Sequence, residues 1–216
     1  MKRPLLLSFA LLIAAILVQA DIARAQTDGG GKIVSDADAV KNALTVGAKM
    51  PQFSLKDSTG RVVSSKELAK SGNLVIVFYR GSWFPFCNLY LGNLQKRLAD
   101  ITAAGGKLVA ISVENPDASM AVARKNEVQF TVLSDPDLDV ARKFGIVYQL
   151  PAATDEMYKS HGLDVAKHNG TAKPELPLAA TYVIDRKGKI VYAYLDTDYK
   201  KRAEPDVIIE NLKKLK

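Results

Sequence analysis

The chain has 216 residues, with 30 Lys and Arg against 23 Asp and Glu and a formal net charge of +7. This length is enough for one well-buried core and too short for two typical domains. The basic residues are scattered, and the runs Lys200-Lys201-Arg202 and "KKLK" are typical of solvated turns and helix ends. Nucleic acid is therefore not an expected partner.

Residues 1–25 have the layout of a secretory signal peptide. Lys2 and Arg3 precede an uncharged apolar run, and small residues follow it. We expect cleavage after Ala25, with Ala20 as the second candidate. The apolar run is short for a membrane span. The sequence thus predicts an exported protein, periplasmic or secreted, with tethering to a membrane by an uncleaved signal anchor as the alternative.

Residues 26–45 begin with a Gly-rich polar stretch and predict a flexible tether, followed by one folded domain over 46–216. The segment "PQFSLKDSTGRVVSS" alternates apolar and polar residues, which predicts a hairpin. Ser64 or Ser65 is expected to cap the short helix that follows. The run "NLVIVFYR" is nearly all apolar, as in a central strand buried on both faces.

From Cys87 onward the apolar residues recur three and four apart, which predicts a helix that ends at Gly105-Gly106. Further strands are expected in "KLVAISV" and "VQFTVLSD", each followed by a helix. A hairpin around Lys187-Gly188 and a closing amphipathic helix complete the chain. This order predicts an α/β sandwich with a mixed central sheet. The segment 148–176 interrupts it and is long enough for a lid or an oligomer contact.

Cys87 is the only cysteine, so the chain has no internal disulfide. An unpaired cysteine in an exported protein indicates a reactive thiol or a thoroughly buried residue. In the first turn of a helix, free N–H groups and the helix dipole favour the thiolate, which is the nucleophilic form. Arg80 would add positive charge nearby, and Pro85 suits the start of a helix.

The alternative is that Cys87 is an inert filler residue. Free cysteine is among the most buried residue types, and the neighbouring rings of Trp83, Phe84 and Phe86 are able to enclose it. Apolar burial also disfavours the thiolate and so opposes the effect of the helix start. The residues alone leave both interpretations open.

Other clusters of polar residues do not have the spacing of a metal or cofactor site. His161 and His168 lie seven residues apart and are interpreted as surface histidines. The aspartates of "SDPDLDV" lack the Gly and Glu of a calcium loop and are interpreted as a turn and a helix cap. No metal and no cofactor are expected.

Several segments in order resemble a bacterial peroxiredoxin-like protein of the alkyl hydroperoxide reductase / thiol-specific antioxidant family. They are "GAKMPQFSLKDSTGRVVSS", "VIVFYRGSW", "LVAISVENPD", "VLSDPDLDVARKFGI", "ATYVIDRKGKIVYAYLD" and "DYKKRAEPDVI". The resemblance extends from about Val46 to the C-terminus. It implies a thioredoxin-like three-layer sandwich of the peroxiredoxin type.

The resemblance also shows where the site departs from its relatives. The related subgroup carries Arg-Gly-Ser-Trp-Cys-Pro-Tyr-Cys-Asn, and this chain has Phe84 in place of the first cysteine. Aligned with peroxiredoxins, Cys87 is the attacking cysteine, Phe84 replaces a threonine and Arg80 a proline. Aligned with thioredoxins, Phe84 replaces the attacking cysteine. Ala179 stands near the position where peroxiredoxins commonly carry a supporting arginine.

The function implied by the resemblance is an exported thiol peroxidase that reduces hydrogen peroxide or organic hydroperoxides through Cys87. An external thiol, for example on a thioredoxin-like partner, would act as reductant, unless Cys87 forms a disulfide between subunits; a homodimer is the implied assembly. The expected site-supporting residues are Arg80, Trp83, Phe84, Pro85 and Asn88. The alternative function is a redox-silent thioredoxin-fold binding module.

Overall fold

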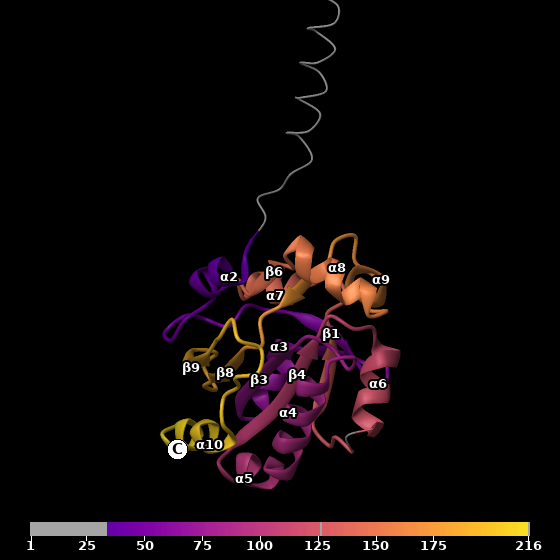
Figure 1. Ribbon diagram of the computed structural model, residues 1–216. Coiled ribbons are helices and arrows are strands. Elements are labelled where there is room, and N and C mark those ends of the chain that lie inside the picture. Colours follow the sequence, from indigo (N-terminus) through magenta and orange to yellow (C-terminus); the bar gives the residue numbers. More distant parts are fainter. Residues whose placement is uncertain (1–33, 126, 216) are drawn as a thin grey trace, which may run out of the picture. The chain divides into compact units, whose positions relative to one another are not determined.

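The computed structural model describes residues 34–125 and 127–215 (Figure 1). The expected signal peptide at 1–25 and the first part of the expected tether lie outside these residues. Within the described ranges, no helix has the length and apolar character needed to span a membrane.

Within the described residues, the central sheet has seven strands in the order β2-β1-β5-β4-β3-β8-β9 (Figure 1). The adjacent strands β3, β4 and β5 run parallel, and all other neighbouring pairs are antiparallel. The mixed central sheet expected from the sequence is therefore confirmed. The strands are β1 (Ser54–Asp57), β2 (Val62–Ser64), β3 (Asn73–Tyr79), β4 (Gly106–Ser112), β5 (Thr131–Ser134), β8 (Thr181–Ile184) and β9 (Ile190–Tyr194).

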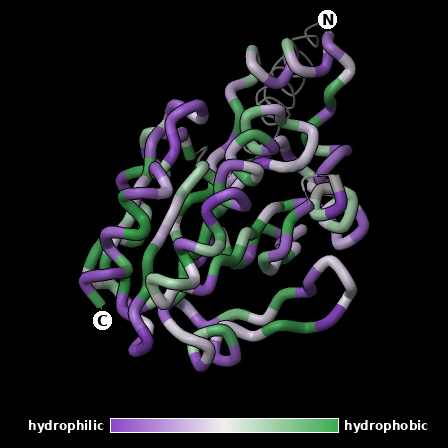
Figure 2. Tube along the Cα trace, turned by 90° about the horizontal axis from the view of Figure 1, so that it is seen from below, coloured by the Kyte–Doolittle hydropathy of each residue, from purple (hydrophilic) through white to green (hydrophobic). Residues whose placement is uncertain are grey.

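Helices cover both faces of this sheet. Alternate residues of the fully buried strand β3 belong to two separate apolar clusters: Ile76 to the one that includes residues of α3 and α7, and Val77 to the one that includes residues of α4, α5 and α10. In Figure 2 hydrophobic residues run along the inner strands, as this three-layer packing requires. The helices concerned are α3 (Ser65–Lys70), α4 (Pro85–Lys96), α5 (Leu98–Ala103), α6 (Pro116–Lys125), α7 (Asp139–Lys143) and α10 (Pro205–Lys213).

The expected hairpin and the expected cap of the next helix are confirmed, and the helix after Cys87 differs in its bounds. Strands β1 and β2 form the predicted hairpin, and the Ser64 hydroxyl caps α3 by accepting a hydrogen bond from the Glu67 N–H at 3.1 Å. The helix expected from Cys87 to Gly105 begins two residues earlier, at Pro85, and is interrupted at Arg97. Arg97 has a non-helical backbone (φ −105°, ψ 9°), so α4 and α5 are separate helices.

The expectation that residues 26–45 are a flexible tether is wrong for residues 34–45. Helix α2 (Asp36–Asn42) begins at an N-cap Ser35 and buries Ala39 completely. The Leu44 N–H donates to the Phe144 carbonyl at 2.9 Å, which fixes the end of α2 to the segment after α7. Burial of this short amphipathic helix offsets the entropy that a free tether would keep.

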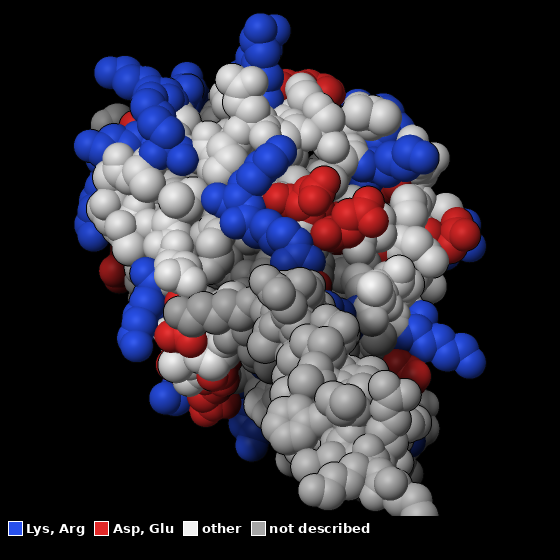
Figure 3. Space-filling model, turned by 90° about the horizontal axis from the view of Figure 1, so that it is seen from above, with Lys and Arg blue, Asp and Glu red and all other residues white. Residues whose placement is uncertain are grey.

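The segment 148–176 is ordered rather than irregular. It forms α8 (Ala152–Ser160) and α9 (Val165–Asn169), and a small antiparallel sheet of β6 (Val147–Gln149) and β7 (Glu175–Pro177) closes its base. These elements pack on the α2 side of the central sheet. Figure 3 views this side and shows Lys and Arg spread over the visible surface with an acidic group among them.

The carboxylate of Asp57 stabilises the β1–β2 hairpin. Its Oδ1 accepts hydrogen bonds from the Thr59 N–H (2.9 Å), the Thr59 hydroxyl (2.7 Å) and the Arg61 N–H (3.0 Å). Burial by itself raises the pKa of Asp57, but the hydrogen bonds from Thr59 and Arg61 outweigh it and hold the pKa below its ordinary value. The stabilisation is therefore present at neutral pH and is lost as the pH falls through this lowered pKa.

Asp57→Asn is accordingly expected to lower the free energy of unfolding by about 1.5 kcal/mol at pH 7, because charge-assisted hydrogen bonds are lost. At pH 3 the difference from wild type is expected to shrink, since the carboxyl of the unfolded wild-type chain is then largely protonated and has to lose that proton on folding. Urea unfolding of both proteins at the two pH values measures it. An equal difference at pH 3 and pH 7 would show that the charge of Asp57 has no part in the effect.

Candidate active site

Cys87 lies in the first turn of α4, directly after the buried strand β3. Its exposed fraction is 0 %, and its neighbours in the apolar cluster include Phe84 and Tyr90. Pro85 is the first residue of the helix, as expected. The structure therefore places Cys87 at the strand-to-helix junction that the sequence predicted, but fully covered.

The expectation of free N–H groups around the sulfur is wrong for the N–H of Cys87 itself. The Phe84 carbonyl accepts hydrogen bonds from the N–H groups of Cys87 at 3.0 Å and of Asn88 at 3.3 Å. The first turn of α4 is thus tightened by an i to i+3 hydrogen bond, and Pro85 has no N–H to offer. A polar contact to the sulfur comes from another part of the chain.

That contact is made by Arg202, which lies in the segment between β9 and α10. The Arg202 Nη2 donates to the Cys87 Sγ at 3.8 Å. The same guanidinium donates to the carbonyl oxygens of Tyr199 and Lys201, which orients it. A guanidinium keeps its charge at every physiological pH, so it interacts more strongly with a thiolate than with a neutral thiol.

Tyr90 fixes the segment that carries Arg202. Its hydroxyl donates to the Ala203 carbonyl at 2.9 Å, and its ring lies 5.7 Å from the Arg202 guanidinium carbon. Burial raises the pKa of Tyr90 to about 12, although the charge of Arg202 acts in the opposite direction. Tyr90 is therefore a neutral donor at physiological pH, and it ties α4 to the residue after Arg202.

Arg80, expected to supply positive charge to Cys87, has a different contact set. Its side chain is 5 % exposed, and its guanidinium carbon lies 4.6, 5.4 and 5.6 Å from the ring centroids of Tyr199, Phe84 and Tyr148. Cation–π contacts of this kind stabilise a desolvated guanidinium. Arg80 thus connects the end of β3 to the segment 148–176 and to the C-terminal segment, while Arg202 contacts the sulfur.

Phe84 and Trp83 form an aromatic cover beside Cys87. The Phe84 ring packs edge-on against Tyr199 with centroids 4.8 Å apart, and against Trp83 at 5.5 Å. Phe84 therefore adds apolar surface where a threonine or cysteine would add a hydroxyl or thiol. Trp83 also contacts His168 of α9, with ring centroids 6.1 Å apart. The segment 148–176 therefore packs against the loop between β3 and α4, the site loop.

A buried carboxylate, which no local sequence pattern marks, holds the loop between β3 and α4. Glu114, 1 % exposed, accepts hydrogen bonds from the Ser82 N–H at 2.8 Å and from the Ser82 hydroxyl at 2.6 Å. The Ser82 carbonyl in turn accepts from the Asn88 side-chain amide at 2.7 Å. Ser82 thus joins the segment after β4 to α4, and Asn88 contacts the loop between β3 and α4 through its side-chain amide.

Glu114 also faces two further groups. His168 Nε2 lies 3.8 Å from Glu114 Oε1, and 43 % of the His168 side chain is exposed. Burial raises the pKa of Tyr79 well above its ordinary value, and the nearby carboxylate of Glu114 raises it further. Tyr79 therefore remains a neutral phenol beneath the loop.

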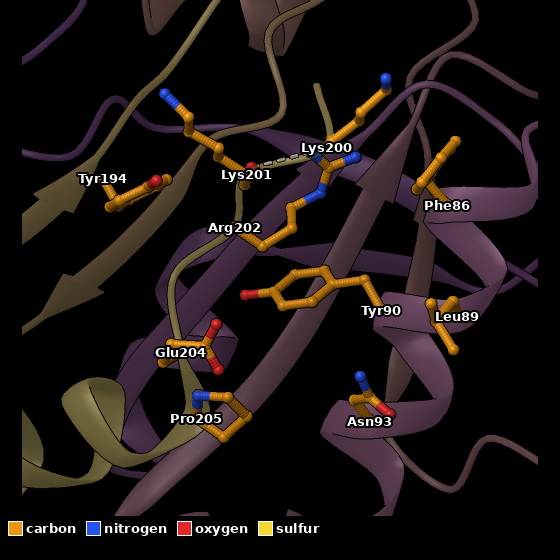
Figure 4. A pocket seen from close by; sticks show the side chains of 10 residues that line it. All are labelled: Phe86, Leu89, Tyr90, Asn93, Tyr194, Lys200, Lys201, Arg202, Glu204 and Pro205. Carbon is orange, nitrogen blue, oxygen red and sulfur yellow. Dashed lines mark hydrogen bonds between the residues drawn. The ribbon is translucent and has the colours of Figure 1, made fainter. Parts of the chain in front are cut away.

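A cavity of about 560 Å³ lies next to Arg202, between α4 and the segment before α10 (Figure 4). Cys87 is not among its lining residues, so Arg202 stands between the cavity and the sulfur. The basic run interpreted from sequence as a solvated turn thus lines this cavity. Its principal lining residues are Phe86, Leu89, Tyr90, Lys200, Lys201 and Arg202.

The two histidines do not form a metal site. His161 Nδ1 lies 2.8 Å from the Met157 carbonyl, whereas His168 contacts Trp83 and Glu114. Among the described residues, no group of three or more His, Cys, Asp or Glu side chains is placed to hold a metal ion.

Comparisons with known proteins identify the family and the fold. A putative peroxiredoxin of Mycobacterium tuberculosis is 29% identical over 150 residues, which are 69% of this chain and 84% of that protein. Peroxiredoxin Bcp of Escherichia coli is 25% identical over 172 residues, 80% of this chain and 97% of that one. The crystal structure of peroxidoxin BcpB from M. tuberculosis superposes on this chain with a TM-score of 0.65 at 19% identity. The match covers 80% of this chain and 99% of that one, and it supports the thioredoxin-like fold. The AhpC/TSA family model matches residues 46–193, and the chain belongs to that peroxiredoxin family.

Proposed function

We propose that this protein is an exported thiol peroxidase that reduces hydrogen peroxide or organic hydroperoxides through Cys87. The observation that carries the proposal is the contact of the Arg202 guanidinium with the Cys87 sulfur, 3.8 Å away, in the first turn of α4. A cysteine reacts as the thiolate, and reactive cysteines lie at helix starts beside a positive charge. Membership of the AhpC/TSA family and the relatives named as peroxiredoxins support the same activity.

The contact with Arg202 favours the alignment in which Cys87 is the attacking cysteine. The Cys87 sulfur attacks one peroxide oxygen, the O–O bond breaks, and the other oxygen leaves as water or an alcohol after taking a proton. Cys87 becomes a sulfenic acid. Arg202 has the charge and the N–H groups to stabilise the negative charge that moves from sulfur to the leaving oxygen.

The burial of Cys87 sets a condition on this reaction. Because the exposed fraction of Cys87 is 0 %, a peroxide reaches the sulfur only when the first turn of α4 or the aromatic cover of Trp83 and Phe84 moves outward. Such local opening costs less free energy than global unfolding. The same burial is the observation that favours the alternative, a redox-silent binding module in which Cys87 is a packing residue.

Reduction of the sulfenic acid requires a thiol from outside the chain, since there is no second cysteine. A thioredoxin-like protein and a small thiol are the two kinds of reductant available for this step. We further propose export by the signal peptide at residues 1–25, with an uncleaved anchor as the alternative. A homodimer, and a disulfide between two Cys87 residues, stay predictions from the resemblance.

The proposal is tested by following peroxide consumption with dithiothreitol as reductant. The mature chain is expected to accelerate consumption of hydrogen peroxide above the rate of dithiothreitol alone, and Cys87→Ser is expected to abolish the acceleration. A folded mature chain that adds nothing to the background rate would favour the redox-silent module instead. Circular dichroism spectra of both proteins control for folding.

A further inference from the structure

The cavity beside Arg202 has an apolar wall and a basic wall (Figure 4). Helix α4 contributes Phe86 and Leu89, which are 41% and 64% exposed although both are large hydrophobic residues. Lys200, Lys201 and Arg202 line the other side. A volume of about 560 Å³ falls within the range of small-molecule sites, roughly 300–1,000 Å³, and is too small for a folded protein domain.

The charge of the lining favours an anion. Glu204 is the one carboxylate among the described lining residues, against three cationic side chains. Lys201 Nζ lies 3.6 Å from an Asp196 carboxylate oxygen, and Lys200 Nζ lies 6.0 Å from the centre of the Phe86 ring. A concave site lined mainly by one sign of charge raises the local concentration of the opposite charge.

Arg202 belongs both to this cavity and to the surroundings of the sulfur. It lines the cavity, and its Nη2 contacts Cys87 Sγ at 3.8 Å. A small molecule whose carboxylates pair with Lys200 and Lys201 would therefore have its other end beside Arg202. That end is the one able to reach Cys87 when the site opens.

We propose that the reductant of oxidised Cys87 is a small, carboxylate-bearing thiol that binds in this cavity. The inference rests on the proposed function, because it concerns the sulfenic acid formed there. A thiol is required at every turnover, since the chain has no second cysteine, whereas hydrogen peroxide is small and uncharged and needs no anion site. The cationic lining therefore matches the reductant better than the oxidant.

The chemistry takes two thiols. The sulfur of the first attacks the sulfenic sulfur of Cys87, an S–S bond forms, the S–O bond breaks, and the oxygen leaves as water with the thiol proton. The second thiol attacks the mixed disulfide, releases Cys87 as the thiolate and leaves as a small-molecule disulfide. Two thiols lose two electrons in total, which returns Cys87 to its starting state.

The test compares thiols of different charge on the same oxidised protein. Cys87 is converted to the sulfenic acid by an equimolar pulse of hydrogen peroxide. Its disappearance is followed by dimedone quenching and intact mass with mercaptosuccinate, 2-mercaptoethanol or cysteamine. Wild type is compared with Lys200→Ala/Lys201→Ala. The matched control is Lys66→Ala/Lys70→Ala, which removes the same charge from α3, outside the cavity lining.

With mercaptosuccinate, the rate at which the sulfenic acid disappears is expected to be about tenfold lower in Lys200→Ala/Lys201→Ala, the cavity variant, than in wild type. At high salt the two rates are expected to become similar, because the charges are then screened. The other two thiols and the control variant are expected to change less than about twofold on the same grounds. Comparing each thiol with itself across variants removes its intrinsic reactivity. A parallel measurement of Cys87 oxidation by a carboxylate-bearing hydroperoxide and by tert-butyl hydroperoxide shows which reaction step depends on the lysines.

Two results would overturn the inference while leaving the proposed function intact. One is an equal effect of the cavity variant on all three thiols. The other is a charge effect confined to oxidation by the anionic hydroperoxide, which would assign the cavity to the substrate. Absence of any sulfenic acid in folded wild type would instead remove the proposed function, and this inference with it.

Discussion

Replacing Arg202 with methionine is expected to slow the reaction of Cys87 with hydrogen peroxide by about 10- to 100-fold. The variant keeps a side chain of similar length but loses the N–H donor 3.8 Å from the sulfur and the positive charge. A hydrogen bond to a charged group contributes about 1.5–3 kcal/mol, and about 1.4 kcal/mol corresponds to a tenfold change in rate. Competition for peroxide against a reference thiol protein measures the second-order rate constant.

Two further variants separate charge from fold. Arg202→Lys keeps the charge without the planar fork and is expected to lose only part of the rate. Arg186→Met makes the same chemical change at an exposed position between β8 and β9 and is expected to react like wild type. If Arg202→Met retains the wild-type rate while folded, the contact with Arg202 plays no part in activating Cys87.

The second large effect is expected from Glu114→Ala, which should lower the free energy of unfolding by about 2–4 kcal/mol. The substitution leaves the N–H and hydroxyl of Ser82 without the acceptors 2.8 and 2.6 Å away, and an unsatisfied buried donor costs about 1–3 kcal/mol. Since Ser82 also holds Asn88 of α4, the site loop loses its anchor to β4. Urea unfolding measures the loss of stability.

Glu114→Gln keeps one side-chain acceptor and is expected to cost less than Glu114→Ala. The control is Glu156→Ala, an exposed position in α8, where a change within about 0.5 kcal/mol is expected. Equal effects at Glu114 and Glu156 would mean that the hydrogen bonds to Ser82 do not hold the loop. In the folded fraction of Glu114→Ala, slower oxidation of Cys87 would link this anchor to reactivity.

Local patterns in the sequence were sufficient for the elements that position the site. The continuous apolar run at Asn73–Tyr79 identified the buried strand β3, and Pro85 together with the change of period identified α4. These signals are local, because the period of apolar residues follows directly from the geometry of a strand or helix. The position of Cys87 at the junction followed from them.

The contacts that complete the site are not local and have no pattern in the sequence. Arg202 contacts Cys87 across 115 positions, and Glu114 contacts Ser82 across 32. Arg80 was the nearest cation in sequence, but its guanidinium packs on the rings of Tyr148 and Tyr199, whereas the hydrogen bond to the sulfur comes from Arg202. Helix α2 did have a local signal, because Ser35 followed by Asp38 is an N-terminal capping pattern; the Gly-rich run before it obscured that signal.

The most direct test of the central claim is whether the fold activates Cys87. The folded mature protein is given a brief, sub-stoichiometric pulse of hydrogen peroxide with dimedone present, and its intact mass is measured beside unfolded protein and Cys87→Ser. We expect a sulfenic adduct on native Cys87 that forms faster than in the unfolded chain. An adduct in the unfolded chain and none in the folded protein would contradict it, and would make Cys87 a packing residue of a redox-silent member of the family.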